Sequence, residues 1–137
     1  EEKEMVRVRL QRLIRDFATD VVGIGIPAQA AEVSARSSIK KVSLRMDRKL
    51  SQVQLLDVAE PGEAASWNIP LLKVEAIVKG CILEEKIGDL AKLRDNLCIT
   101  LVMNGKPGML LAFDSTIERD RVWTCLRIAS HSNPGKG

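Results

Sequence analysis

The spacing of apolar residues changes twice along this chain, and that change limits the folds open to it. At both ends apolar residues recur every three to four positions, as in an amphipathic helix, whereas the region between them alternates apolar and polar residues, as in strands. Helices that flank a run of strands, rather than alternate with them, indicate an α+β domain. The sequence therefore predicts a first helix, about seven strands in two sets and a closing helix.

The first predicted element is an amphipathic helix over residues 3–19. Acidic residues at its start and arginines further along agree with the direction of the helix dipole. Because an apolar stripe left in water would form a contact surface, we expect it to pack on the domain's own sheet, with self-association and membrane contact as alternatives. The stripe consists of Val6, Leu10, Leu13, Ile14 and Phe17, and the arginines around it are Arg7, Arg9, Arg12 and Arg15.

Strands are predicted in three segments after this helix. Residues 21–35 are small and apolar but interrupted by two glycines and a proline, which indicates a bent first strand. Residues 38–57 alternate apolar and polar side chains around a short turn, which predicts a hairpin. Residues 67–80 are predicted to form two short strands interrupted by a proline, the second with Val74, Ala76 and Val78 on one face.

The clearest hairpin is predicted over residues 97–114. The turn-forming pairs Asn104-Gly105 and Pro107-Gly108 separate two runs that are rich in strand-forming residues. Ahead of this hairpin, residues 80–96 are predicted to form an insertion with a short helical turn.

A closing amphipathic helix is predicted after Ser115, which forms a capping-box sequence with Glu118. We expect one core domain over residues 21–131, preceded by the helical segment 1–20 and followed by a flexible tail, 132–137. The predicted stripe of the closing helix is Ile117, Val122, Trp123, Cys125, Leu126 and Ala129. The residues expected to form the structural core are Trp123, Leu126, Phe113 and Val122.

Composition argues against several classes of function. The longest stretch without a charge is far shorter than the roughly 20 apolar residues that a membrane-spanning helix needs. Three cysteines with no close pair argue against a disulfide framework or a zinc site, and the one histidine lies in the predicted tail. With two Phe, two Trp and no Tyr, the 137 residues supply little for stacking on nucleic-acid bases. We therefore expect no enzyme, no cofactor, no metal and no nucleic-acid partner.

One glycine motif suggests a nucleotide site, which we consider and set aside. Residues 23–28 match the dinucleotide fingerprint G-x-G-x-x-A, and Asp47 follows at a suitable distance. That mechanism needs a strand before the loop and a helix after it, whose N-terminus holds the pyrophosphate. Because neither is predicted here, glycines in a bent strand are the better interpretation, and a small-ligand or enzyme domain using this loop is the rival.

A basic cluster is the main polar feature of the sequence. Residues 36–49 carry a net charge of +5, whereas the rest of the chain is net negative and the whole chain sums to +3. The cluster could be a solvated face with general attraction to an anionic membrane, a protein contact, or a site for a specific lipid head group. Its basic residues are Arg36, Lys40, Lys41, Arg45, Arg48 and Lys49.

About seven strands closed by an amphipathic helix with a central tryptophan resemble the pleckstrin-homology superfold. The resemblance covers residues 21–130 and places Trp123 where that family keeps its core tryptophan. It implies an α+β fold in which a seven-stranded, bent β-sandwich or barrel is capped at one open end by the C-terminal helix. The N-terminal helix is extra to that fold.

The chain is also similar, in three segments, to the apicomplexan inner membrane complex sub-compartment proteins: WNIPLLKVEAIVKG, LCITLVMNGKPGMLLAFDS and IERDRVWTCLRI. This resemblance implies a non-enzymatic scaffold or anchoring module of the membrane skeleton beneath the parasite surface. It implies attachment through myristoyl and palmitoyl groups on Gly and Cys residues upstream of Glu1. It also implies a peripheral position on the cytoplasmic side of the inner membrane complex, and protein partners whose identity it does not specify.

The resemblance also suggests the alternative, a phosphoinositide-reading domain that uses Lys41 and Arg45. Phosphoinositide-binding members of the superfold place a Lys at the end of the first strand and a [Lys/Arg]-x-Arg pattern on the second. Here residues 21–35 contain no Lys or Arg, and Ser43 stands where the middle cation of the second strand belongs. The loss of two converging cations predicts weak head-group binding, so we expect specific phosphoinositide recognition to be absent.

Overall fold

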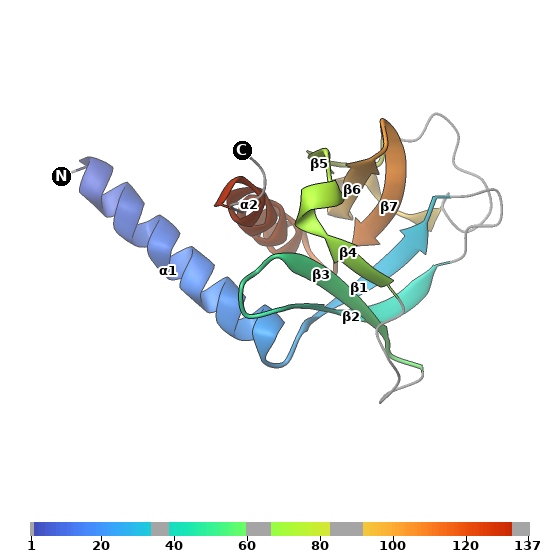
Figure 1. Ribbon diagram of the computed structural model, residues 1–137, viewed down its shortest axis with the longest axis horizontal. Coiled ribbons are helices and arrows are strands. Elements are labelled where there is room, and N and C mark those ends of the chain that lie inside the picture. Colours follow the sequence, from blue (N-terminus) through green and yellow to red (C-terminus); the bar gives the residue numbers. More distant parts are fainter. Residues whose placement is uncertain (1, 34–38, 60–66, 83–91, 133–137) are drawn as a thin grey trace.

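A computed structural model describes residues 2–33, 39–59, 67–82 and 92–132 of the chain. One α-helix precedes the strands along the chain and one follows them, as the change in periodicity predicts, and both lie on the same side of the sheet (Figure 1). The helices are α1 (Glu2–Val22) and α2 (Thr116–Ser132), with short 3₁₀ turns η1 (Leu71–Lys73) and η3 (Asp95–Leu97). The strands are β1 (Ile26–Glu32), β2 (Lys40–Met46), β3 (Gln52–Asp57), β4 (Trp67–Pro70), β5 (Ala76–Lys79), β6 (Cys98–Met103) and β7 (Lys106–Ala112).

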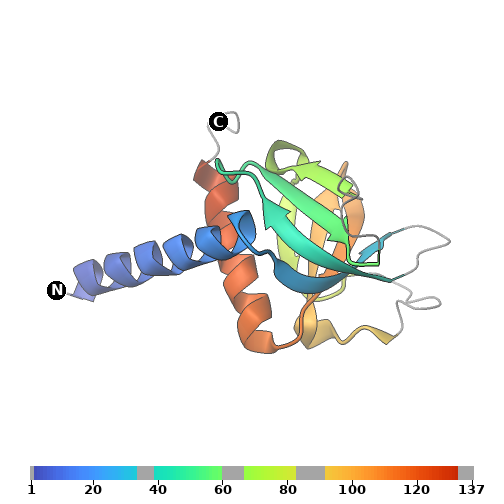
Figure 2. The same cartoon turned by 90° about the horizontal axis from the view of Figure 1, so that it is seen from below.

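The strands form one antiparallel sheet in the order β4-β3-β2-β1-β7-β6-β5. The two predicted sets of strands are therefore joined, because β1 pairs with β7 in the middle of the sheet. The sheet curls around the main apolar core, to which Leu44 and Leu55 contribute from one half and Leu101 and Leu111 from the other. A second, smaller cluster of buried residues includes Leu93 and Leu110. Helix α2 lies across one end of the curled sheet (Figures 1 and 2). The predicted pleckstrin-homology-like architecture is confirmed.

Helix α1 runs three residues beyond its predicted end, so the first strand starts at Ile26 rather than Val21. Two glycines make the turn: Gly23 N donates to Thr19 O (3.1 Å), and Gly25 N donates to Asp20 O (2.6 Å). Gly25 has φ +93°, and a Cβ at this position would collide with the Ser43 hydroxyl. Because only glycine fits there, the bend that the sequence indicates lies ahead of the strand rather than within it.

Both predicted hairpins form, but the turn of the second is shorter than predicted. β2 and β3 pair as expected. In the β6–β7 hairpin the turn consists of Asn104 and Gly105 alone, both left-handed (φ 55° and 77°), as a two-residue type I′ turn requires. Pro107 and Gly108 lie inside β7 instead of marking the turn, and a register shift between Leu101 and Val102 accommodates them.

The segment over residues 67–80 departs from its predicted pattern. Pro70 ends β4 as expected, but a 3₁₀ turn then precedes β5, and Val74 is buried outside that strand. In β5 itself Ala76 is exposed and Ile77 packs against the core, so the predicted face of Val74, Ala76 and Val78 is wrong. Most of the predicted insertion lies outside the described residues, as does the tail from 133 on.

One of the two hydrogen bonds of the predicted capping box forms at the start of helix α2. Ser115 Oγ accepts a hydrogen bond from Glu118 N (3.1 Å), whereas the Glu118 carboxylate accepts one from Arg121 Nη2 (2.7 Å). Val122, Cys125 and Leu126 are buried, and so is Phe113 just before the helix. Ile117 is 80% exposed, contrary to the prediction, because five positions before Val122 is about 1.4 turns, which places it on the opposite side of the helix.

The second half of α1 belongs to the core, which generates a first prediction. Phe17 is fully buried, so Phe17→Ala should lower the free energy of unfolding by about 3–5 kcal/mol, the cost typical of a buried aromatic. The control is Val6→Ala, at an exposed position of the same helix. Denaturant unfolding followed by circular dichroism measures both. We propose that α1 and the sheet unfold as one unit; a Phe17→Ala protein as stable as the Val6→Ala protein would contradict this.

Candidate functional site

The basic residues singled out in the sequence are divided between the two ends of β2. Lys40 and Lys41 begin the strand, whereas Arg48 and Lys49 lie in the turn after it ends. A strand rises about 3.3 Å per residue, so the two groups are separated by roughly 17 Å or more. Arg36 lies outside the described residues. The cluster that is contiguous in sequence is therefore not one patch in space.

At the first end of β2, carboxylates lie beside the lysines. Lys40 Nζ is 4.0 Å from Asp57 Oδ2 and 5.6 Å from the centre of the Trp67 ring. Lys41 lines two hollows of about 290 and 420 Å³, of which the first also holds Asp114 and the second Asp57. A carboxylate in each hollow repels the phosphates of a head group, so this end does not form a converging set of cations.

Arg45 has a structural role. It lies on the outward face of β2, where Arg45 Nη2 donates to Ile24 O (3.2 Å) and its side chain covers Gly25. Its Nε is buried and has no hydrogen-bond partner among the described residues. Arg45 therefore fastens the turn between α1 and β1 to the sheet, and its guanidinium is only partly available to a ligand.

The turn after β2 is built on Asp47. Its carboxylate accepts hydrogen bonds from Ser51 N (2.7 Å), Ser51 Oγ (2.6 Å) and Gln52 N (2.8 Å). Burial raises the pKa of Asp47, but these hydrogen bonds to the charged form outweigh it and leave the pKa below its ordinary value of 3.8. This turn holds Arg48 and Lys49, both exposed, in a defined position.

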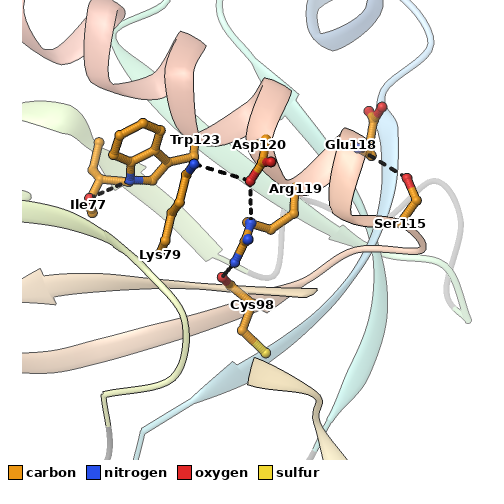
Figure 3. Close-up of polar contacts among 8 residues, drawn as sticks. All are labelled: Ile77, Lys79, Cys98, Ser115, Glu118, Arg119, Asp120 and Trp123. Atoms are coloured by element: carbon orange, nitrogen blue, oxygen red, sulfur yellow. Dashed lines mark hydrogen bonds and ion pairs between the residues drawn. The ribbon is translucent and has the colours of Figure 1, made fainter. Parts of the chain in front are cut away.

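Trp123 lies over the edge of the sheet rather than deep in the core. It is partly buried: its indole Nε1 donates to Ile77 O in β5 (2.9 Å), which only a position at the sheet edge allows (Figure 3). Two cations lie over its ring, with Lys79 Nζ 4.4 Å and Arg127 Cζ 4.7 Å from the ring centre. Trp123, which we expected in the structural core, packs against it while partly buried, and its indole N–H takes a polar partner at the sheet edge.

Ion pairs extend this cluster along α2. Asp120 Oδ1 is 3.3 Å from Lys79 Nζ and 2.8 Å from Arg119 Nε, and Arg119 Nη1 donates to Cys98 O (3.2 Å) (Figure 3). Together with Trp123 these contacts cover β5, one of the two edge strands. The cluster protects a sheet edge from pairing with another chain, which is a structural role.

Helix α1 packs on the domain over only half its length. Phe17 and Val21 are fully buried, and Leu13 and Ile14 pack against the core. We call residues 3–12 the projecting half, because this part of the helix extends away from the sheet and α2 (Figures 1 and 2). Its four large apolar side chains are exposed: Met5 by 58%, Val6 by 55%, Val8 by 52% and Leu10 by 39%.

The expected packing of the first helix is therefore correct for its second half and wrong for its first. Four exposed arginines, Arg7, Arg9, Arg12 and Arg15, accompany the uncovered apolar residues. The sequence contains a signal for this division, because half of residues 3–12 are charged. Exposed apolar side chains bordered by basic ones are typical of an interaction site, and four of the nine large apolar side chains that are exposed on the described residues belong to the projecting half.

The glycine motif does not form a nucleotide site. Helix α1 precedes residues 23–28 and strand β1 begins within them, which is the reverse of the strand–loop–helix order that the dinucleotide fingerprint requires. Among the described residues no group of three His, Cys, Asp or Glu side chains could hold a metal ion.

Two of the three cysteines are buried and the third, Cys81, is partly so. Burial raises the pKa of the Cys125 thiol to about 11, so it stays protonated and unreactive near neutral pH. No described helix combines the length and the apolar character needed to cross a bilayer.

A curled seven-stranded sheet capped at one end by a C-terminal helix is the pleckstrin-homology-like fold. Two similar structures are from Toxoplasma gondii: Inner Membrane Complex Sub-compartment Protein 1 (14% identity, TM-score 0.63, covering 88% of this chain and 93% of that one) and Sub-compartment Protein 3 (11%, 0.60, 89% and 86%). The pleckstrin-homology domain from TgAPH is also similar (12%, 0.55, 87% and 89%).

The predicted resemblance to the sub-compartment proteins is thus confirmed in structure, and at these identities the likeness shows the fold. No family model and no curated protein sequence matches the chain.

The hydrogen bonds to Asp47 generate a pH prediction. Because the folded pKa is lowered, the carboxylate stabilises the turn fully above its ordinary pKa of 3.8, and this contribution is lost as the pH falls through the lower folded value. Asp47→Asn should therefore destabilise the protein at pH 7, and the difference in unfolding free energy from the parent should shrink towards pH 3. Arg48→Gln, in the same turn, is the control. A difference that is constant between pH 7 and pH 3 would contradict the prediction.

Proposed function

We propose that this protein is a non-enzymatic scaffold or anchoring module of an inner membrane complex. Acyl groups on residues ahead of Glu1 attach it to the cytoplasmic side of the membrane as a peripheral protein, and its surface binds proteins of the membrane skeleton. Support comes from the structural likeness to two sub-compartment proteins whose names place them in that complex, over most of both chains. The segments that resemble this family in sequence form β4, β5, β6, β7 and α2.

The single observation that favours a scaffold over a lipid reader is the division of the basic residues. Head-group recognition needs several cations directed at adjacent phosphates, whereas Lys41 lies at the start of β2 and Arg48 in the turn after its end. Arg45, between them, is bonded to Ile24 O. A pleckstrin-homology-like domain without a converging cation set keeps a rigid surface suited to protein contacts.

The second candidate function is phosphoinositide reading through Lys41 and Arg45. It is favoured by one observation: both side chains lie on the outward face of β2, on either side of Ser43. The carboxylates of Asp57 and Asp114 beside Lys41 oppose it.

Vesicle sedimentation separates the two candidates. Two preparations of phosphatidylcholine vesicles are compared, one containing phosphatidylserine and the other a phosphoinositide, at equal total charge. The scaffold proposal expects the same binding of this chain to both, unchanged in the Lys41→Ala/Arg45→Ala double variant, with Lys106→Ala, an exposed lysine, as the control. Preference for the phosphoinositide that disappears in the double variant alone would establish the lipid reader instead.

Localisation tests the membrane-skeleton proposal directly. The protein with its natural upstream segment, tagged at the C-terminus and expressed in Toxoplasma gondii, should form a rim beneath the plasma membrane together with an inner membrane complex marker. The matched control begins at Glu1 and should lose the rim, because it lacks the acylated segment. Uniform cytosolic signal from the longer protein would overturn the proposal.

A further inference from the structure

We propose that the projecting half of α1 is a docking site for an acidic amphipathic helix of a partner protein. This deepens the proposed scaffold function and rests on it for the existence of a protein partner. The site is the stripe side of the helix, centred on Val6 and Leu10 and bordered by Arg7 and Arg9.

Spacing places Val6 and Leu10 on the side of α1 that packs on the domain further along. They precede Phe17 by eleven and seven positions, about three and two helical turns. Phe17 is fully buried, whereas Val6 and Leu10 are 55% and 39% exposed. One apolar stripe is thus covered by the domain at its end and uncovered at its start. Apolar side chains of a partner placed on Val6 and Leu10 would continue the domain's own core along the helix.

The charges around the stripe specify an acidic partner. Residues 3–12 carry four basic side chains against the single acid Glu4, a net charge of +3. On the helix surface Arg7 and Arg9 lie about 80° to either side of the stripe, at 3.6 residues per turn. Both are exposed. A partner helix with Glu or Asp on both sides of its apolar face would therefore meet a cation along each border.

A second copy of this chain fits the site poorly. If two copies of α1 paired in antiparallel fashion so that Val6 met Leu10, Arg7 of one copy would lie on the same flank as Arg7 of the other, and Arg9 on the same flank as Arg9. Each projecting half also carries the same net charge of +3. Like charges at this distance repel, so the site favours a partner of opposite charge.

A flat membrane also fits poorly, for a geometric reason. Val6 and Leu10 lie on the same side of α1 as Phe17, which packs into the body of the domain. A bilayer surface pressed against this side would meet the body first. A partner helix, about 10 Å across, needs to contact only α1.

The chain supplies its own controls. Met5 and Val8 are as exposed as Val6 and Leu10 but lie on the opposite side of the same turns. Val6→Ser/Leu10→Ser is therefore matched by Met5→Ser/Val8→Ser. The charge pair Arg7→Gln/Arg9→Gln is matched by Arg12→Gln/Arg15→Gln, which removes the same charge from the far side.

The probe is a labelled three-heptad peptide with Leu at its apolar positions and Glu on both flanks, compared with one that carries Lys on both flanks. Fluorescence anisotropy with the whole chain measures binding at several salt concentrations. The Glu peptide should bind the parent chain. It should bind Val6→Ser/Leu10→Ser at least about tenfold more weakly, because truncating central apolar contacts has that scale of effect. Arg7→Gln/Arg9→Gln should weaken binding and its salt dependence, whereas both control pairs stay within about twofold of the parent. Equal melting temperatures confirm that the variants fold.

Several outcomes would overturn the docking site. They are no binding of the Glu peptide, equal binding of the Lys peptide, or losses as large in the Met5→Ser/Val8→Ser control. A dimer in sedimentation that dissociates in Val6→Ser/Leu10→Ser would assign the surface to a second copy. Binding to phosphatidylserine vesicles that needs Val6 and Leu10 would assign it to the membrane. Localisation to the cytosol with intact peptide binding would instead reject the inner-membrane-complex function and leave the docking site in place.

Discussion

The pairing of β1 with β7 is the interaction on which the rest of this structure depends. It joins four strands from the first part of the chain to three from the last part, from Gln29 opposite Ala112 to Glu32 opposite Met109. Because α1 leads into β1 and α2 follows β7, the same pairing brings the two helices together. Their contact includes an ion pair between Asp20 and Arg121 (2.8 Å). Without the pairing of β1 with β7, neither helix would have a complete sheet surface to cover.

The sheet also determines which polar residues can act together. A strand carries residues that are neighbours in sequence to opposite ends of the domain, so the basic segment from Lys40 to Lys49 does not form one site. Arg45 contributes to the attachment of α1, through its hydrogen bond to Ile24 O. Part of the positive charge that the sequence offers to a ligand is thus used to build the fold.

The size of the core explains why α1 has two halves. The domain covers the helix where Phe17 and Val21 enter the apolar cluster, and beyond Leu13 the helix leaves its surface. An uncovered stripe with a basic border is costly to keep in water unless something covers it. The fold therefore presents a rigid helix at a set angle to the sheet. A partner bound there would be held at a defined orientation to any anchor ahead of α1.

The sequence by itself determined the elements that depend on local physics: the change of period that predicts both helices, the Asn104-Gly105 hairpin, and the Ser115 cap. It also carried enough of a family pattern to indicate the pleckstrin-homology-like fold. Only the tertiary structure decided what depends on distant neighbours. Trp123 lies at a sheet edge because its N–H finds Ile77 O, and α1 is half covered because the core ends at Leu13. Periodicity shows that a face is apolar, whereas the surface placed opposite it decides whether that face is buried.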